Sequence, residues 1–468
     1  MPDRLDVVLR AARAVVGDVE RPAAVGVRAG RVQVVAGVGA ALTADEEIVL
    51  GDDVVLLPGL VDTHVHLQDP GHPDWEDFGS GTRAAALGGV TTLVDMPLDS
   101  VPVTVDVSAL AAKRAAAQGR VHVDVGFWGG LVPANLARPD ELAALVAAGV
   151  AGFKCFLADT GSADFPPVSP AQLRAGLRAV RELDSVLLVH AEDDAERLDA
   201  PPAGASYRAW LAARPAAVEE RAVAEVVAAV AETGGRAHVV HVSSAGGADL
   251  VARARRAGLP ITAETCPHYL TLAAADVPDG ATAYAVAPPV RERSDAEALW
   301  RRLRDGGLDL VVSDHSPAAA APGEPGADSS DFDAVPPGIA SLQLALPVVW
   351  TAARARGATL VDVARWMSSG PARLARLAGK GGIAPGRDAD FVVLAPDATF
   401  TVDPRDLAQR RQVTPYAGRV LRGVVTQTWL AGRPLDLRAG EPQGRLLTPS
   451  LPSRASHPSH PPRPRAGV

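Results

Sequence analysis

Residues 57–66 read Leu-Pro-Gly-Leu-Val-Asp-Thr-His-Val-His, a short apolar run that ends in two histidines at alternate positions. If this run is a β-strand, successive side chains face opposite sides, so His64 and His66 point to the same side. Two neutral imidazoles on one side of a strand end can bind one divalent metal ion. An isolated His-x-His pair is also compatible with two hydrogen-bonded polar residues in a turn. The pattern of the remaining chain decides between the two interpretations.

Short apolar runs alternate with stretches rich in Ala, Leu and Arg through most of the chain. Eight such runs cover residues 54–62, 91–95, 121–127, 150–157, 186–190, 237–242, 260–266 and 308–314. The helices expected between them include 170–183, 216–233 and 295–304. Eight strands alternating with helices are typical of a (β/α)8 (TIM) barrel, and apolar strands buried on both faces suit its parallel sheet. We therefore predict an α/β protein with a barrel over residues 54–375.

The two ends of the chain show a different pattern, with short strands and glycine turns. Strands are expected at 25–28, 32–35, 48–50 and 391–394, and a hairpin over 419–430. Neither end can close a large core alone, so residues 1–53 and 376–446 are expected to form one small β-sandwich. Residues 447–468, rich in Pro, Ser, His and Arg, are expected to be a disordered tail in which His457 and His460 are solvated.

Composition narrows the class of protein. The 468 residues, 47% hydrophobic and 22% charged, are those of a soluble globular protein. A net charge of −9 gives no support to a nucleic-acid or anionic-membrane partner, and no apolar run reaches membrane-spanning length. Only two cysteines occur, Cys155 and Cys266, which excludes a disulfide framework and fits a reducing cytoplasm.

Polar residues gather at the predicted strand ends, where barrel enzymes place their active sites. They are His64, His66, Lys154, His190, His241 and Asp314. Four imidazoles and a carboxylate would suit two divalent ions, Zn²⁺ in the first place and Co²⁺, Mn²⁺ or Fe²⁺ as alternatives. A single histidine at a strand end commonly has a structural role. Five potential ligands at one end of separate strands are hard to reach by accident.

Lys154 stands out because it lies in an otherwise apolar strand. A cationic ammonium there would be poorly solvated and would repel metal ions. Two explanations remain open at this point. The lysine could be a salt-bridged structural residue, or its amine could have reacted with carbon dioxide to give a carbamate whose two oxygens bridge two metals.

Five stretches of this chain resemble the cyclic amidohydrolases, the group of dihydroorotases, hydantoinases and allantoinases. They are residues 62–66, 84–92, 152–157, 264–270 and 312–317, and the resemblance covers nearly the whole chain apart from the tail. It implies that His64, His66 and Asp314 hold one metal, that His190 and His241 hold the other, and that carbamylated Lys154 bridges them. It also implies that a hydroxide shared by the metals is the nucleophile. Asp314 would then carry its proton to the departing ring nitrogen.

Three positions bear on the branch of the group. Gln68 stands where dihydroorotases resembling this chain usually have an arginine for the substrate carboxylate, and Asp159 stands where hydantoinases usually have a tyrosine. Residues 96–100 read Met-Pro-Leu-Asp-Ser, close to the Met-Pro-Leu-Asn-Ser typical of allantoinases. Asp99, and Asp69 where Glu is common, depart from that pattern. The resemblance thus favours opening of the allantoin ring to allantoate. Another cyclic amidase, or a non-catalytic scaffold, is the alternative.

Substrate contacts in this group come largely from loop backbone. The matching positions are Ala287 and Gly338, beside Gln68, although Gly338 could equally be a turn glycine. His268 and His315 could orient metal ligands or be structural. The resemblance further implies a small cyclic ureide as the substrate and a homotetramer as the assembly.

Overall fold

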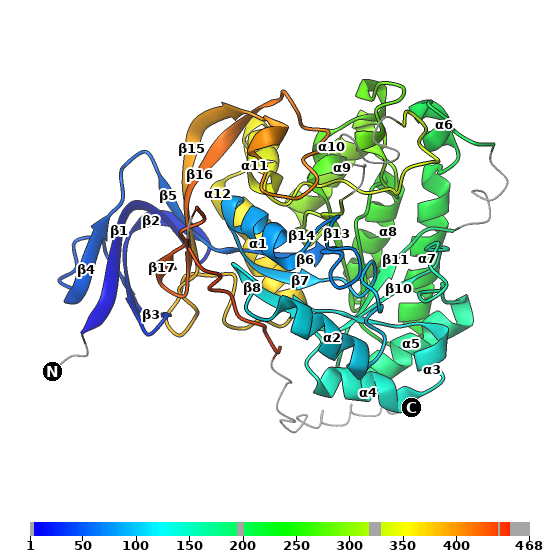
Figure 1. The fold of residues 1–468 in the computed structure, drawn as a ribbon, viewed down its shortest axis with the longest axis horizontal. Coiled ribbons are helices and arrows are strands. Elements are labelled where there is room, and N and C mark those ends of the chain that lie inside the picture. Colours follow the sequence, from blue (N-terminus) through cyan, green and yellow to red (C-terminus); the bar gives the residue numbers. More distant parts are fainter. Residues whose placement is uncertain (1–3, 194–200, 318–328, 439, 450–468) are drawn as a thin grey trace, which may run out of the picture.

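The computed structural model of the chain describes residues 4–193, 201–317, 329–438 and 440–449. Figure 1 shows the strands of both chain ends side by side at one side of the molecule, while the helices surround the strands of the larger part. No helix among the described residues is long and apolar enough to cross a membrane.

Both chain ends contribute to one eight-stranded sheet. Its order is β17-β16-β15-β5-β1-β2-β3, with β4 paired to β1. The strands are β1 Leu5–Val16, β2 Val19–Arg28, β3 Arg31–Ala36, β4 Ala44–Val49, β5 Val55–Pro58, β15 Phe391–Thr401, β16 Val420–Leu430 and β17 Arg433–Pro434. β5 connects the two ends, because it pairs with both β1 and β15. The expected partnership between the ends is therefore present, and the long strand β1 joins the three strands predicted near the N-terminus.

Two predictions about these strands were wrong. The run over 54–62 is two strands, separated at Gly59, and only the second, β6 (Leu60–Val65), belongs to the parallel strands. A Cβ at Gly59 would lie 2.2 Å from Thr91 Oγ1, so the chain can turn from one sheet into the other only with glycine there. The segment 419–430 is the single strand β16 rather than a hairpin. Its partner is β15, and Gly423, with φ of +94°, lies in an irregular stretch of that pairing.

The parallel strands follow one another in chain order. A three-stranded sheet has the order β6-β7-β8, and a six-stranded sheet runs β14-β13-β12-β11-β10-β9. Beside β6, the strands are β7 Val90–Asp95, β8 Asp124–Phe127, β9 Gly129–Gly130, β10 Phe153–Phe156, β11 Leu187–His190, β12 Ala237–Val239, β13 Ile261–Thr265 and β14 Leu310–Val311. Only Trp128 separates β8 from β9. At the other side, the His66 N–H donates to the carbonyl of His315 (2.8 Å), just beyond β14. The α/β class is confirmed.

Helices lie between these strands, as the alternating pattern predicted, and α11, α12 and α13 follow the last of them. They are α1 Phe78–Leu87, α2 Val107–Ala117, α3 Pro133–Leu136, α4 Pro139–Ala147, α5 Pro170–Glu182, α6 Tyr207–Ala212, α7 Ala216–Thr233, α8 Ala245–Arg256, α9 Pro267–Thr271, α10 Arg293–Asp305, α11 Ala345–Ala355, α12 Leu360–Ala364 and α13 Gly370–Leu374. The helices α5, α7 and α10 match their predicted spans to within two residues. In α5, Ser169 caps the first turn, and Leu173, Leu177 and Val180 form the buried stripe that packs on the strands.

The start of the predicted tail is ordered. Leu447 donates its N–H to the carbonyl of Val125 (2.7 Å), so the chain lies along β8 at this point and the expectation of disorder from residue 447 was wrong there. Residues 450–468, which include His457 and His460, lie outside the described residues.

A buried carboxylate ties the first parallel strand to the segment after the last one. Asp62 accepts hydrogen bonds from the His64 N–H (3.1 Å) and from the Ser313 N–H (2.9 Å). His64 is 1% exposed and Ser313 is fully buried, so neither N–H can turn to water instead. The carboxylate therefore fixes the spacing between the segments that carry His64 and Asp314.

We expect Asp62→Ala to destabilise the protein, because each buried N–H that loses its acceptor costs about 1–3 kcal/mol. The urea midpoint should fall in proportion, with an unchanged slope if the unfolded state is unaffected. Asp18→Ala, at an exposed turn, is the control. Equal midpoints for the two variants would contradict this role of Asp62.

Candidate active site

A cavity of about 720 Å³ opens at the carboxyl ends of the parallel strands. All nine residues predicted for the site line it: His64, His66, Gln68, Lys154, His190, His241, Ala287, Asp314 and Gly338. They come from six different strands or the loops that follow them. The topology therefore brings together residues that are up to 274 positions apart in the chain.

His64, His66 and Asp314 form the first group of possible metal ligands. One donor atom from each lies within 4.8 Å of the others. His64 Nε2 is 3.1 Å from Asp314 Oδ1, in a geometry that makes no hydrogen bond, and His66 Nε2 is 3.8 Å from the same oxygen. Burial lowers the pKa of His64 to about 3, so its imidazole is neutral, and burial raises the pKa of Asp314 to about 7. Two imidazoles and a carboxylate around one point fit a divalent ion.

His190 and His241 form a second group beside the first. His190 Nδ1 lies 2.8 Å from His241 Nε2, and the ring of His241 is 5.4 Å from that of His64. Burial holds the pKa of His241 well below its usual range. Two nitrogens facing each other inside a buried site fit a second cation. His241 and Asp314 both have left-handed backbone, with φ of +39° and +48°, a strain of about 1–3 kcal/mol each that is typical of functional sites.

Lys154 differs from the other lysines of the chain. The sequence holds only three, and all are buried. Lys113 pairs with Asp95 (2.5 Å), and Lys380 pairs with three aspartates, whereas Lys154 has no ion pair among the described residues. Its Nζ instead lies 4.7 Å from the centre of the Phe156 ring. Burial lowers the pKa of Lys154 to about 8. The salt-bridged interpretation of Lys154 thus finds no partner in the described part of the chain.

Carboxylates behind the imidazoles were missed as site residues. Glu264 contacts His64 Nδ1 (2.5 Å) and His238 Nε2 (2.9 Å), while Glu192 contacts His190 Nε2 (2.9 Å). A carboxylate on the outer nitrogen fixes the tautomer and the orientation of a ligating imidazole. Glu264 opens one of the stretches that carry the family resemblance, but its partner His64 is 200 residues away, so spacing could not reveal the contact.

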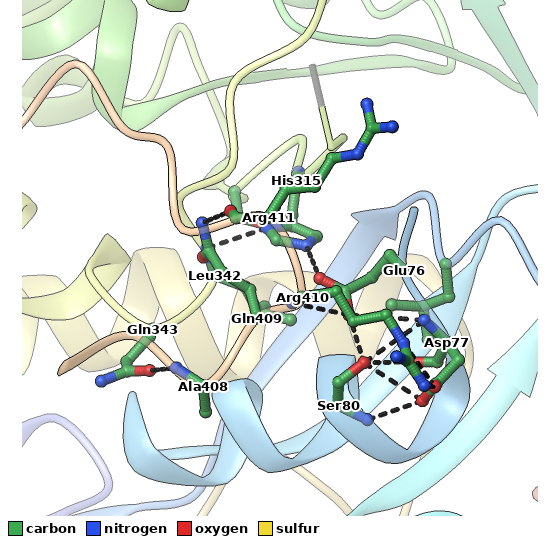
Figure 2. A network of polar contacts seen from close by, with 12 residues as sticks. Glu76, Asp77, Ser80, His315, Leu342, Gln343, Ala408, Gln409, Arg410 and Arg411 are labelled. Atoms are coloured by element: carbon green, nitrogen blue, oxygen red, sulfur yellow. Dashed lines mark hydrogen bonds and ion pairs between the residues drawn. The ribbon is translucent and has the colours of Figure 1, made fainter. Parts of the chain in front are cut away.

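His315 and His268 occupy different environments next to Asp314. Figure 2 shows His315 between Glu76 and Leu342: its Nε2 lies 3.3 Å from Glu76 Oε2, and the Leu342 N–H donates to its Nδ1 (3.3 Å). These contacts anchor the segment that carries Asp314. His268 is fully buried against Tyr269, and neither of its nitrogens has a hydrogen-bond partner among the described residues.

Gly338 approaches its neighbour closely. A Cβ at this position would lie 2.8 Å from the Ser316 side chain, and the Gly338 N–H donates to the carbonyl of Ala285 (2.8 Å). Glycine is therefore required here for packing, whatever its contact with a substrate. Gln68 lines the cavity with a φ of +49° and contributes a neutral amide to it.

Parallel strands that deliver imidazoles, a carboxylate and an unpaired lysine to one cavity define a metal-dependent hydrolase. The chain belongs to the amidohydrolase family, whose sequence profile matches residues 55–435. It is 48% identical to an allantoinase of Streptomyces avermitilis, covering 95% of this chain and 99% of that protein. It is 41% identical to an allantoinase of Saccharomyces cerevisiae over 81% of this chain and 82% of the other. Among solved structures, the L-hydantoinase (dihydropyrimidinase) of Arthrobacter aurescens superposes with a TM-score of 0.87 at 28% identity, covering 95% of this chain and all of that one.

We expect Glu264→Gln to weaken metal binding by about 10–100-fold, because the amide cannot accept from both imidazoles that Glu264 now holds. Competition with a metal chelator measures the affinity. Glu46→Gln, on the exposed strand β4, is the control. Unchanged affinity in Glu264→Gln would refute the orienting role.

Proposed function

We propose that this chain hydrolyses the cyclic amide of allantoin to allantoate. The observation that carries the proposal is the near full-length similarity to allantoinases from bacteria, plants and yeast, together with the cavity lined by all the expected ligands. In the reaction, water adds across the ring C–N bond: its oxygen bonds to the carbonyl carbon, and its proton ends on the released nitrogen.

We propose that His64, His66 and Asp314 hold one divalent ion, that His190 and His241 hold a second, and that a carbamate on Lys154 contributes oxygens to both. Zn²⁺ suits this nitrogen and oxygen set, with Co²⁺, Mn²⁺ and Fe²⁺ as alternatives. When bound, such ions polarise a carbonyl and lower the pKa of water to about 7. The lack of an ion pair between Lys154 and any described residue supports the carbamate, since carbon dioxide adds to a neutral amine and gives an anion in place of a buried cation.

Asp314 is the proposed general base and acid. Its carboxylate faces the cavity beside His64, where it can take a proton from the attacking water and return it to the ring nitrogen. An amide nitrogen leaves poorly unless protonated, so the second transfer matters as much as the first. Gln68 and the backbone at Ala287 and Gly338 would contact the neutral ring.

We also infer the barrel, the β-sandwich, the cellular compartment and the assembly. The succession of β8 and β9 and the contact between His66 and His315 support a closed (β/α)8 barrel that begins at β6, residue 60, rather than at residue 54, and extends to residue 375. Packing of Val25 with Phe391 and Trp429 supports a β-sandwich of the two chain ends, in which the N-terminal part extends through β5 to residue 58 and the C-terminal part covers residues 376–446. Two free, buried cysteines suit a reducing cytoplasm, and a homotetramer is the assembly we propose, to be tested by sedimentation.

The substrate is tested by assaying allantoin, hydantoin, dihydrouracil and dihydroorotate side by side with metal-loaded protein and bicarbonate. We expect a clear preference for allantoin. The structural likeness to hydantoinases makes a hydantoin or a dihydropyrimidine the second candidate. Turnover of these compounds without turnover of allantoin would move the protein to that branch and overturn the proposal.

Replacing Lys154 with Ala should abolish metal uptake and activity, and acetate should restore part of both by supplying a carboxylate. Because the chain has only three lysines and the other two are in ion pairs, ¹³C-labelled bicarbonate should give one lysine carbamate NMR signal in the wild type. The signal should be absent from Lys154→Ala. Full activity of that variant would refute the bridging carbamate.

A further inference from the structure

We propose that Asp99 is a positioning residue for His66, holding the imidazole so that its Nε2 faces Asp314. This inference rests on the metal centre of the proposed function and deepens it. Asp99 lies in the loop that follows β7, and the structure brings its Oδ2 within 2.8 Å of His66 Nδ1. Nε2 on the opposite side of that ring is the atom that approaches Asp314 Oδ1.

The orientation of the buried His66 imidazole depends on Asp99. Among the described residues, His66 Nδ1 makes no aligned hydrogen bond, and Asp99 is the carboxylate in ion-pair contact with it. The imidazole is 7% exposed, so bulk water is a poor substitute. A buried nitrogen with one neighbouring acceptor takes its orientation from that acceptor.

Two other imidazoles of the site also have a carboxylate beside the outer nitrogen, and there the contact is an aligned hydrogen bond. Glu264 lies on the outer nitrogen of His64, and Glu192 lies on the outer nitrogen of His190. Asp99 completes the pattern for the second histidine of the first ligand group. The repetition on separate strands argues that the contact belongs to the metal centre rather than to loop packing.

Asp99 differs from the other two carboxylates in its accessibility and its backbone. Its side chain is 39% exposed toward the cavity, whereas that of Glu264 is fully buried. Its φ of +66° is held by the surrounding loop, in which the Val101 N–H donates to the carbonyl of Pro70 and the Thr104 N–H to that of Pro97, both at 2.7 Å. Asp99 thus links His66 to the loop that forms the rim of the cavity.

The test compares Asp99→Ala and Asp99→Asn with the wild type in metal binding. We expect Asp99→Ala to lower Co²⁺ affinity by about 10–100-fold at one of two sites, and Asp99→Asn, which keeps an acceptor oxygen, to lose less. The visible spectrum of the Co²⁺ protein should change with the ligand geometry in Asp99→Ala. Asp164→Asn, which removes a carboxylate from the same cavity, should change neither.

Unaltered Co²⁺ affinity and spectrum in Asp99→Ala would overturn the inference. Asp99→Asn is nearly isosteric, so a folded protein is expected, and its thermal midpoint checks this. The metal-binding measurement requires no substrate. Failure of the wild type to open allantoin would therefore refute the proposed function alone, while equal metal binding by all variants would refute the role of Asp99 alone.

Discussion

The geometry of the site depends on the Asp62 carboxylate. It accepts hydrogen bonds from backbone N–H groups of the two segments that begin and end the series of parallel strands. His64 and Asp314 are brought to one point by chain segments some 250 residues apart, so small errors in strand spacing would separate them. A buried acceptor shared by both segments removes that freedom. The indole N–H of Trp128, which donates to the carbonyl of Thr63 (2.8 Å), adds a third strand to the same arrangement.

The three lysines show how differently one protein can accommodate a buried amine. Lys380 is surrounded by Asp124, Asp388 and Asp390 at 2.5–2.9 Å, and this cluster joins β8 to the strand β15 of the end sheet. Against the cost of burial, these carboxylates raise the pKa of Lys380 above its usual range. Lys154 is buried and forms no ion pair with any residue that the structure describes. Asp314 and Glu264 favour the charged amine from a distance, but burial outweighs them, and the lack of an ion pair among the described residues is informative about chemistry at the amine.

The periodicity of the sequence was sufficient for the parallel strands, for most helices and for the residues at strand ends, because these features are local. The span of α7 could be predicted because its buried apolar residues recur at helical spacing along 18 residues. The division at Gly59 and the continuous strand β16 were not predictable, since each is decided by a distant partner: Thr91 at the first and β15 at the second. Glu264 was missed for the same reason, since its partner His64 is 200 residues away, whereas Glu192 lies only two residues after its partner His190 and was missed although the contact is local. The periodicity of the sequence carries no information on metal binding, so it could not assign the roles of the ligands.

The sheet made from both chain ends sets an order on biosynthesis. Strand β5 leaves the ribosome with one neighbour already made, while its other neighbour, β15, is more than 330 residues further along. Throughout that interval, which lasts about 20–70 s at 5–20 residues per second, the growing chain carries an apolar strand edge without its final partner. Such an edge is a template for pairing with other chains. Chaperone demand during synthesis should therefore be concentrated on the N-terminal segment rather than on the strands that carry the metal ligands.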